Sequence, residues 1–376
     1  MKKYEYTHFI PENVAPKGAT GMVIQDQSGK VISSTPKSEF NGMAWPEDLG
    51  EKEGSFAVFS DIHISSTEAA NRFKNAVMYV ADVEKVDFIC VSGDLVNGSN
   101  VVTELEAQLR DYISLVVSLV GAGDSLCANK IEIHDTTGNH DVQSKMATKS
   151  YLQEYADGVE PYASRELYYE FTRGDDLFIM FGMTAWPGSK ASGPVYSDES
   201  YDWLEDTLAA NKDKRCFLFS HPPYFTTDAT QNNGNGIVVD SGSGAIVGYP
   251  PPTGTYIQWY STSAPRFKNA LNSHPNLLWF HGHSHIEFFY QEIAPYVNYC
   301  RENFESNDLP GVHSIHVPSL AVGREPKPDW SGWHAPTPIR GGEGYIVDRY
   351  KKYVVLRGFN FVEKRAVPIA TYCIKT

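Results

Sequence analysis

Residues 276–289 read NLLWFHGHSHIEFF, a short apolar run followed by a turn that carries two histidines. These histidines, His283 and His285, are two positions apart, and residues two apart in extended backbone project to the same side. Gly282 precedes them and permits a close approach of neighbouring backbone. Two imidazoles aimed at one point beside a strand end are typical of metal ligands, whereas the alternative is a pair of histidines in a polar loop. The rest of the chain decides between these interpretations.

Four further stretches repeat this arrangement, in which a strand-like run ends close to residues that can bind metal. Each run has four or five apolar or alternating residues, rich in Val, Ile and Phe. The runs and the residues that follow them are 56–59 with Ser60, Asp61, Ile62 and His63; 87–91 with Ser92, Gly93 and Asp94; 130–134 with Gly138, Asn139, His140 and Asp141; and 216–219 with Ser220, His221, Pro222 and Pro223. We therefore expect five strand ends to meet at one metal site.

Together these motifs resemble the ordered signature of the calcineurin-like metallophosphoesterase superfamily. That signature reads DxH, GD, GNH(D/E), H and GHxH, and all of its parts occur here in the same order. The resemblance covers about residues 55–320 and implies a dimetal phosphoester hydrolase. It also implies an α/β fold, a four-layer αββα sandwich of two mixed β-sheets flanked by helices.

The predicted order of strands and helices agrees with such a fold. Helical patterns extend from residue 66 or 67 to about 80, over 102–120, near 198–210 and near 264–272. Alternating strands and helices imply parallel strands, which place ligands beyond their carboxyl ends. Further strands are predicted at 175–183, 313–317, 344–349 and 353–359, the last two forming a C-terminal β-hairpin.

We expect the chain to have two parts. Residues 1–53 form an N-terminal extension, with a β-hairpin of residues 21–25 and 30–33 around a turn at 27–29. Residues 54–376 form the metallophosphoesterase catalytic domain. Within it, the 224–263 insert is rich in Gly, Asn and Pro and directly follows a predicted ligand motif, so we expect a lid that faces the substrate.

Composition limits which functions and which cellular compartments we expect. The 376 residues carry a formal net charge of -14, and nucleic-acid affinity depends on Lys and Arg contacts to phosphate, so we expect no general nucleic-acid binding. No apolar run is long enough for a membrane span, and the opening MKKYEYTHFIPEN lacks the apolar region of a signal peptide. The default expectation is a cytoplasmic protein. If the natural N-terminus was trimmed, the alternative is a secreted or cell-surface protein.

The resemblance divides the metal ligands between two ions. One ion is held by Asp61, His63 and His285, and the other by Asn139, His221 and His283. Asp94 bridges the ions, because the two oxygens of one carboxylate can hold two cations at the separation of roughly 3.5–4 Å that two-metal sites have. Imidazole with oxygen ligands suits Mn, Fe or Zn better than Ca, so we expect two divalent or mixed-valence ions of these metals.

The resemblance also assigns the catalytic step. A water between two cations loses its proton near neutral pH, and the resulting bridging hydroxide attacks the phosphorus. We expect His140 to protonate the leaving group, and Asp141 or another carboxylate to keep that imidazole charged and oriented. The alternative for His140 is a structural histidine beside the ligands. Arg165 and Arg324 present forks that suit phosphate, but no substrate-binding residue is predicted.

The residues within the motifs narrow the class of substrate. Asn97 stands where purple acid phosphatases carry a tyrosine, and the GDxVDRG and GNHE motifs of protein serine/threonine phosphatases are absent. The motifs GDL, GNHD, HPP and GHSH are most similar to the bacterial phosphodiesterase branch. We therefore expect a small phosphoester substrate, with a phosphodiester slightly favoured over a phosphomonoester. The alternative is a non-catalytic or cell-surface binding protein that retains the metallophosphoesterase fold.

Overall fold

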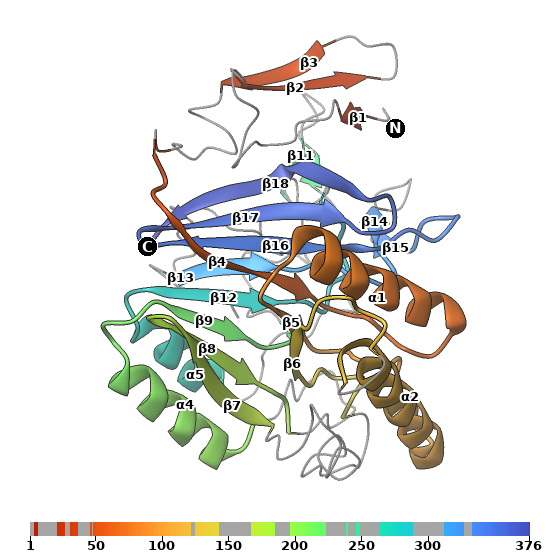
Figure 1. The fold of residues 1–376 in the computed structure, drawn as a ribbon, viewed down its shortest axis with the longest axis vertical. Coiled ribbons are helices and arrows are strands. Elements are labelled where there is room, and N and C mark those ends of the chain that lie inside the picture. The colour runs from red at the N-terminus through yellow and green to blue at the C-terminus, as the bar shows by residue number, and fades with distance from the viewer. Residues whose placement is uncertain are drawn as a thin grey trace.

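The first large β-sheet has six strands in the order β18-β17-β16-β4-β5-β6 (Figure 1). The structure is a computed structural model that describes residues 4–6, 21–26, 31–36, 46, 48–121, 125–142, 167–184, 196–222, 238–239, 246–248, 264–288, 312–326 and 333–376. The six strands are β4 (Lys52–Phe59), β5 (Phe88–Ser92), β6 (Glu132–Thr136), β16 (Glu343–Tyr350), β17 (Tyr353–Asn360) and β18 (Arg365–Lys375). β4, β5 and β6 are parallel, whereas β16, β17 and β18 continue the sheet as antiparallel strands.

A second sheet has five strands in the order β13-β12-β9-β8-β7. Its strands are β7 (Tyr168–Arg173), β8 (Asp176–Phe181), β9 (Cys216–Phe219), β12 (Leu277–His281) and β13 (Val312–His316). All neighbours pair in parallel except β7, which forms an antiparallel hairpin with β8. Both sheets are therefore mixed.

Helices cover the outer face of each sheet (Figure 1). α1 (Thr67–Tyr79), its continuation η2 (Val80–Glu84) and α2 (Val102–Val120) pack their apolar faces on the six-stranded sheet. α4 (Asp198–Ala210) and α5 (Ala264–Asn272) cover the five-stranded sheet in the same way. The order of layers is helix, sheet, sheet, helix, which confirms the expected four-layer αββα sandwich.

Alternation along β4 shows how the sequence builds these layers. Ala57 and Phe59 point toward α1 and α2, whereas Phe56 and Val58 point into the space between the sheets. The ring centroid of Phe56 lies 5.2 Å from that of Phe88 in its own sheet and 5.3 Å from that of Phe178 in the other sheet. Such close aromatic packing holds the sheets together, so loops at the ends of both sheets keep a fixed relation.

The carboxyl ends of the parallel strands carry the predicted ligands. The assignments are Asp61 and His63 after β4, Asp94 after β5, Asn139 after β6, His221 after β9, and His283 and His285 after β12. These strands come from both sheets, and their carboxyl ends lie at the same end of the sandwich because hydrogen bonds join the loops directly. The His283 N–H donates to Asp61 Oδ2 at 2.9 Å and His221 Nδ1 donates to Ser92 O at 2.7 Å, and each bond joins a loop of one sheet to a loop of the other.

Three small sheets complete the described residues. β1 (Tyr4–Tyr6), β2 (Gly21–Asp26) and β3 (Val31–Pro36) form an antiparallel sheet, in which β2 and β3 pair at the position of the expected N-terminal hairpin. β10 (Val238–Val239) pairs with β11 (Ile246–Gly248), and β14 (Glu325–Pro326) with β15 (Trp333–His334). Apart from β10 and β11, the predicted lid at 224–263 lies outside the described residues, and the domain boundary at residue 53 stays a prediction. Among the helices of the described ranges, none has the length and apolar character needed to cross a bilayer.

Glu343, at the start of β16, gives the fold a pH dependence that can be measured. Its Oε2 accepts a hydrogen bond from the Phe288 N–H at 2.8 Å, and burial together with the charge of Glu287 raises the pKa of Glu343 to about 8. The folded state therefore binds more protons than the unfolded chain between about pH 4.3, where a free Glu titrates, and pH 8, and the free energy of unfolding falls as pH rises through this window.

We expect Glu343→Gln to remove this fall, because Gln does not titrate and its side-chain oxygen still accepts the Phe288 N–H. Relative to wild type, the variant should gain on the order of 4 kcal/mol of unfolding free energy between pH 5 and pH 9. Urea denaturation of both metal-free proteins across this range measures the difference. Glu51→Gln, at an exposed position, is the control; an equal gain there, or a pH-independent difference for Glu343→Gln, contradicts the assignment.

Candidate metal centre

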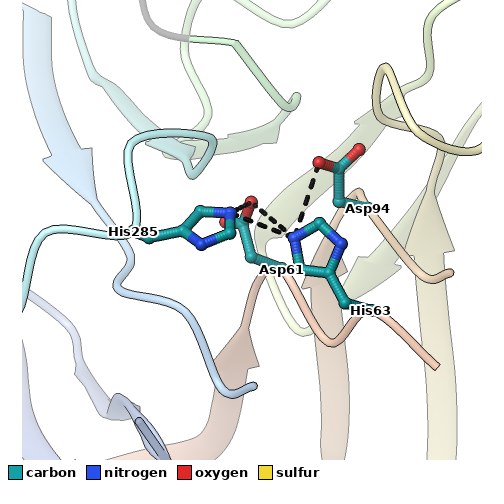
Figure 2. Close-up of side chains that lie close together, drawn as sticks. All are labelled: Asp61, His63, Asp94 and His285. Carbon is teal, nitrogen blue, oxygen red and sulfur yellow. Dashed lines mark hydrogen bonds and ion pairs between the residues drawn. The ribbon is translucent and has the colours of Figure 1, made fainter. Parts of the chain in front are cut away.

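Asp61, His63, Asp94 and His285 form the first cluster of potential metal ligands, and all four are buried. Figure 2 shows these side chains turned toward one another from the loops after β4, β5 and β12. Asp61 Oδ1 lies 2.9 Å from His285 Nε2. His63 Nε2 lies 3.7 Å from Asp61 Oδ1, 3.8 Å from Asp94 Oδ2 and 3.0 Å from His285 Nε2.

A second cluster consists of Asp94, His221 and His283. His221 Nε2 lies 3.1 Å from Asp94 Oδ2, and the rings of His221 and His283 are 5.3 Å apart between centroids. Asp94 thus belongs to both clusters, at the position that the sequence predicts for a bridging ligand. The structure brings together six of the seven predicted ligands in these groups. The seventh, Asn139, is buried on the loop after β6, next to a residue whose N–H donates to Asp94.

Two features of the clusters fit bound cations: their dimensions and the buried polar atoms that lack hydrogen-bond partners. The potential ligand atoms of each cluster lie within 4.8 Å of one another. Metal–ligand bonds of about 2.0–2.2 Å place two ligands of one ion roughly 3–4 Å apart, so each cluster has the dimensions of a coordination sphere. Among the described residues, the buried atoms that lack a hydrogen-bond partner include three atoms of predicted ligands: Asp61 Oδ1, Asn139 Oδ1 and His221 Nε2. Unsatisfied buried polar atoms are costly, and a cation would satisfy all three.

Backbone carbonyls orient two of the histidines for metal binding. His221 Nδ1 lies 2.7 Å from Ser92 O, and His285 Nδ1 lies 3.0 Å from Val322 O. Because a carbonyl oxygen can only accept, each Nδ1 carries the proton and donates it. Each Nε2 then faces its cluster with a lone pair, which is the arrangement that metal-bound histidines commonly show.

The loops that carry the ligands adopt an uncommon backbone conformation. Five of the predicted ligands are non-glycine residues with positive φ: Asp61 at 51°, His63 at 44°, Asp94 at 52°, His283 at 75° and His285 at 61°. The left-handed region is unfavourable for residues with a Cβ atom and persists only where the surrounding structure enforces it. Such conformations concentrate at functional sites, which supports a functional role for these loops.

Two glycines allow the ligand loops to meet. A Cβ atom at Gly138 would overlap the Asp94 side chain, and one at Gly282 would overlap the side chains of Ser60 and Asp61. Both glycines directly precede predicted ligands, in the GNHD and GHSH motifs. Their place in the motifs therefore follows from the close approach of neighbouring loops.

The family model for calcineurin-like phosphoesterases matches residues 54–287. The chain belongs to the calcineurin-like phosphoesterase family. The matched range begins in β4 and ends two residues after His285, so it contains every ligand that the sequence predicts. No curated protein matches the chain.

Three solved structures that match the chain have low sequence identity and TM-scores below 0.5. GAP50, described as the anchor in the inner membrane complex of Plasmodium, is 15% identical, with a TM-score of 0.44 over 85% of this chain and 87% of that one. A predicted phosphoesterase from Streptococcus pneumoniae is 10% identical, with a TM-score of 0.34 over 86% and 98% of the two chains. The protein TT1561 of Thermus thermophilus is also 10% identical, with a TM-score of 0.36 over the same shares. The family assignment rests on the match over residues 54–287.

Charges in this calcineurin-like phosphoesterase are arranged to suit cations. Burial alone would raise the pKa values of Asp61 and Asp94, but the neighbouring histidines hold both well below the usual range. Burial lowers the pKa of His283 to about 3, so that imidazole is neutral. Burial would also lower the pKa of His221, but the two carboxylates raise it to about 9. The two carboxylates thus favour positive charge at this position, which suits a cation, and metal binding would displace any proton held there.

His140 stands at the edge of the clusters with 31% of its side chain exposed. Its Nδ1 donates to the Asn97 carbonyl, so its Nε2 points toward the ligands and lies 3.9 Å from Asp94 Oδ2. Its backbone N–H donates to Asp94 Oδ1 at 2.8 Å. This imidazole is therefore held beside both clusters and remains accessible to a substrate.

Asp141 occupies a different position from the one expected. We expected its carboxylate, or another one, to orient His140, but it accepts hydrogen bonds from three backbone N–H groups. These belong to Leu95 at 3.2 Å, Val96 at 3.0 Å and Gly138 at 2.7 Å. Asp141 therefore fastens the loop after β5 to the loop after β6, and the Asn97 carbonyl orients the imidazole instead. Arg165 lies outside the described residues.

Sequence reasoning missed the groups that position Asp61. Ser60 Oγ and the His283 N–H donate to Asp61 Oδ2 at 2.7 and 2.9 Å, which leaves Oδ1 for the cluster. Ser319 Oγ donates to the Asp61 carbonyl at 2.8 Å. The one feature of the sequence that could have indicated Ser60 is its position directly before a predicted ligand. Ser319 has none, because its partner is 258 positions away in the chain.

Proposed function

We propose that this chain is a metal-dependent hydrolase of small phosphodiesters, with phosphomonoesters as poorer substrates. The observation that carries the proposal is the pair of ligand clusters that share Asp94, beside the accessible imidazole of His140. Two-metal sites bridged in this way serve the displacement of a phosphoester leaving group. The family assignment supports the same chemistry.

Each group of residues has a proposed role. Asp61, His63 and His285 would hold one ion; Asn139, His221 and His283 would hold the other; Asp94 would bind both. When bound, Mn, Fe or Zn ions would supply an activated water and neutralise charge on the phosphoryl oxygens. The imidazole of His140 would donate its Nε2 proton to the leaving-group oxygen as the phosphorus–oxygen bond breaks.

Two observations support the preference for a diester. The motifs GDL, GNHD, HPP and GHSH are most similar to the bacterial phosphodiesterase branch. The chain also carries a formal net charge of -14. A phosphodiester has one negative charge, whereas a monoester carries close to two at neutral pH, so an acidic protein repels the diester less than the monoester.

Hydrolysis assays with bis-p-nitrophenyl phosphate and p-nitrophenyl phosphate test the proposal directly. The purified protein is depleted of metal, reloaded with Mn²⁺, Fe²⁺ or Zn²⁺, and analysed for its metal content. We expect two ions per chain and a higher kcat/KM for the diester, and the metal-depleted protein is the control. Faster cleavage of the monoester overturns the diester preference. Full metal content without cleavage of either ester favours a binding protein that retains the fold.

A further inference from the structure

A short segment at residues 322–326 runs beside the metal ligand His285. The Arg324 N–H donates to the His285 carbonyl at 2.7 Å, and the Glu287 N–H donates to the Arg324 carbonyl at 3.3 Å. Ile286 and Arg324 form a parallel β-bridge. Together with the hydrogen bond between His285 and Val322 O, these contacts fix the backbone of Arg324 directly beside the first cluster.

The side chain of Arg324 lies on the face of this segment opposite to that of Glu325. The next residue, Glu325, forms an ion pair with Arg340, which also binds Glu287 with its Nη2 3.0 Å from Glu287 Oε2. Successive residues in extended backbone project to opposite sides, so Arg324 faces away from these carboxylates. The electrostatics agree: burial is the largest cause that lowers the pKa of His285, and the positive charge of Arg324 lowers it further.

The guanidinium of Arg324 has no protein partner among the described residues. It is half-buried, and no residue that the structure describes forms a side-chain hydrogen bond or an ion pair with it. Two other arginines that contact the same region are paired: Arg72 donates to the Ala321 carbonyl and to Glu68, and Arg340 binds two glutamates. A guanidinium without a protein partner, on a segment that runs beside the metal centre, is suited to an anionic ligand.

We propose that Arg324 binds a non-bridging oxygen of the phosphoryl group that reacts at the two ligand clusters. This inference rests on the proposed function, because it places phosphate at the clusters. A guanidinium fork matches two phosphate oxygens and remains charged at all working pH values. Negative charge on the non-bridging oxygens is present throughout phosphoryl transfer, so a fixed cation beside them aids binding and reaction.

Binding of inorganic phosphate to the metal-loaded protein tests the proposal without turnover. Calorimetry compares wild type with Arg324→Met, which removes the charge, and with Arg324→Lys, which keeps the charge but loses the fork. We expect the Kd for phosphate to rise about 10- to 100-fold in Arg324→Met and by a smaller factor in Arg324→Lys. The metal content of both variants should equal that of wild type, since Arg324 is not a predicted ligand.

The control is Arg266→Met, which changes the net charge equally but lies on α5, where the arginine pairs with Asp202 and Glu205. Its Kd for phosphate should stay within about twofold of wild type. An Arg324→Met protein with full metal content and unchanged phosphate affinity overturns the proposal, as does an equal loss in Arg266→Met.

Failure of this inference is distinct from failure of the proposed function. A wild-type protein that cleaves the diester while Arg324→Met binds phosphate normally retains the function and refutes the role of Arg324. A wild-type protein that cleaves neither ester but loses phosphate affinity in Arg324→Met refutes hydrolysis and supports the phosphate contact.

Discussion

Asp94→Asn should lower the affinity for both metal ions at least on the order of 100-fold, because even the loss of a group that only supports a ligand costs about 10- to 100-fold. Asp94 is the one residue that belongs to both clusters of the described site, with Oδ2 3.1 Å from His221 Nε2 and 3.8 Å from His63 Nε2. Asparagine keeps the shape but loses the negative charge and one oxygen. Elemental analysis after dialysis measures the metal content, and hydrolysis should fall with it.

Two matched variants separate the bridging role from general damage. Asp61→Asn alters a carboxylate of the first cluster alone, so that protein should retain close to one ion while Asp94→Asn retains close to none. Asp348→Asn removes a buried carboxylate that pairs with Lys52 and Arg357 on the six-stranded sheet, and it should keep both ions. Full metal content and full activity in Asp94→Asn would falsify the assignment of Asp94 as the bridge.

Most of the fold was predictable because its elements are buried in simple patterns. α2, α4 and α5 begin and end at the predicted residues, since each has apolar side chains at helical spacing on one face. The central strands are continuous apolar runs because both of their faces are covered. β7 was not predicted, because its side chains are half-buried or exposed and it lacks the continuous apolar run of the central strands.

β18 was missed for a different reason. Residues 365–375 contain Pro368, and a proline inside a run argues against a central strand. The structure places β18 at the edge of the six-stranded sheet, with a register irregularity opposite residues 357–359. An edge strand tolerates a residue that cannot donate a hydrogen bond. Sheet position is a tertiary property, so the sequence alone could not supply it.

In the candidate site, too, some features were predictable from the sequence and others were not. Six of the seven predicted ligands meet in the described clusters, and each was recognisable because it follows a strand within a short motif. The groups that orient them were not, because they are backbone carbonyls, such as Asn97 O and Val322 O, or side chains far away in sequence. Asp141 shows the limit of sequence adjacency: it follows His140 in the chain, yet its carboxylate turns toward backbone amides on a neighbouring loop.

His140→Ala should retain both metal ions and lose on the order of 10²- to 10⁴-fold in kcat, because the metal ligands remain while proton donation to the leaving group is lost. In the described structure His140 contributes a backbone N–H to Asp94, which alanine preserves, and an imidazole whose Nε2 lies 3.9 Å from that carboxylate. Kinetics on metal-loaded protein, with metal content measured on the same sample, test this expectation. His134→Ala, a histidine on β6 that stacks on Phe171, is the control and should leave kcat nearly unchanged.

The leaving group distinguishes proton donation from a structural role for His140. p-Nitrophenolate leaves readily without a proton, whereas an alkoxide needs one, so loss of an acid should slow alkyl diesters far more than p-nitrophenyl diesters. An equal loss on both kinds of ester, or a loss of metal in His140→Ala, would instead assign His140 to holding the Asp94 loop in place.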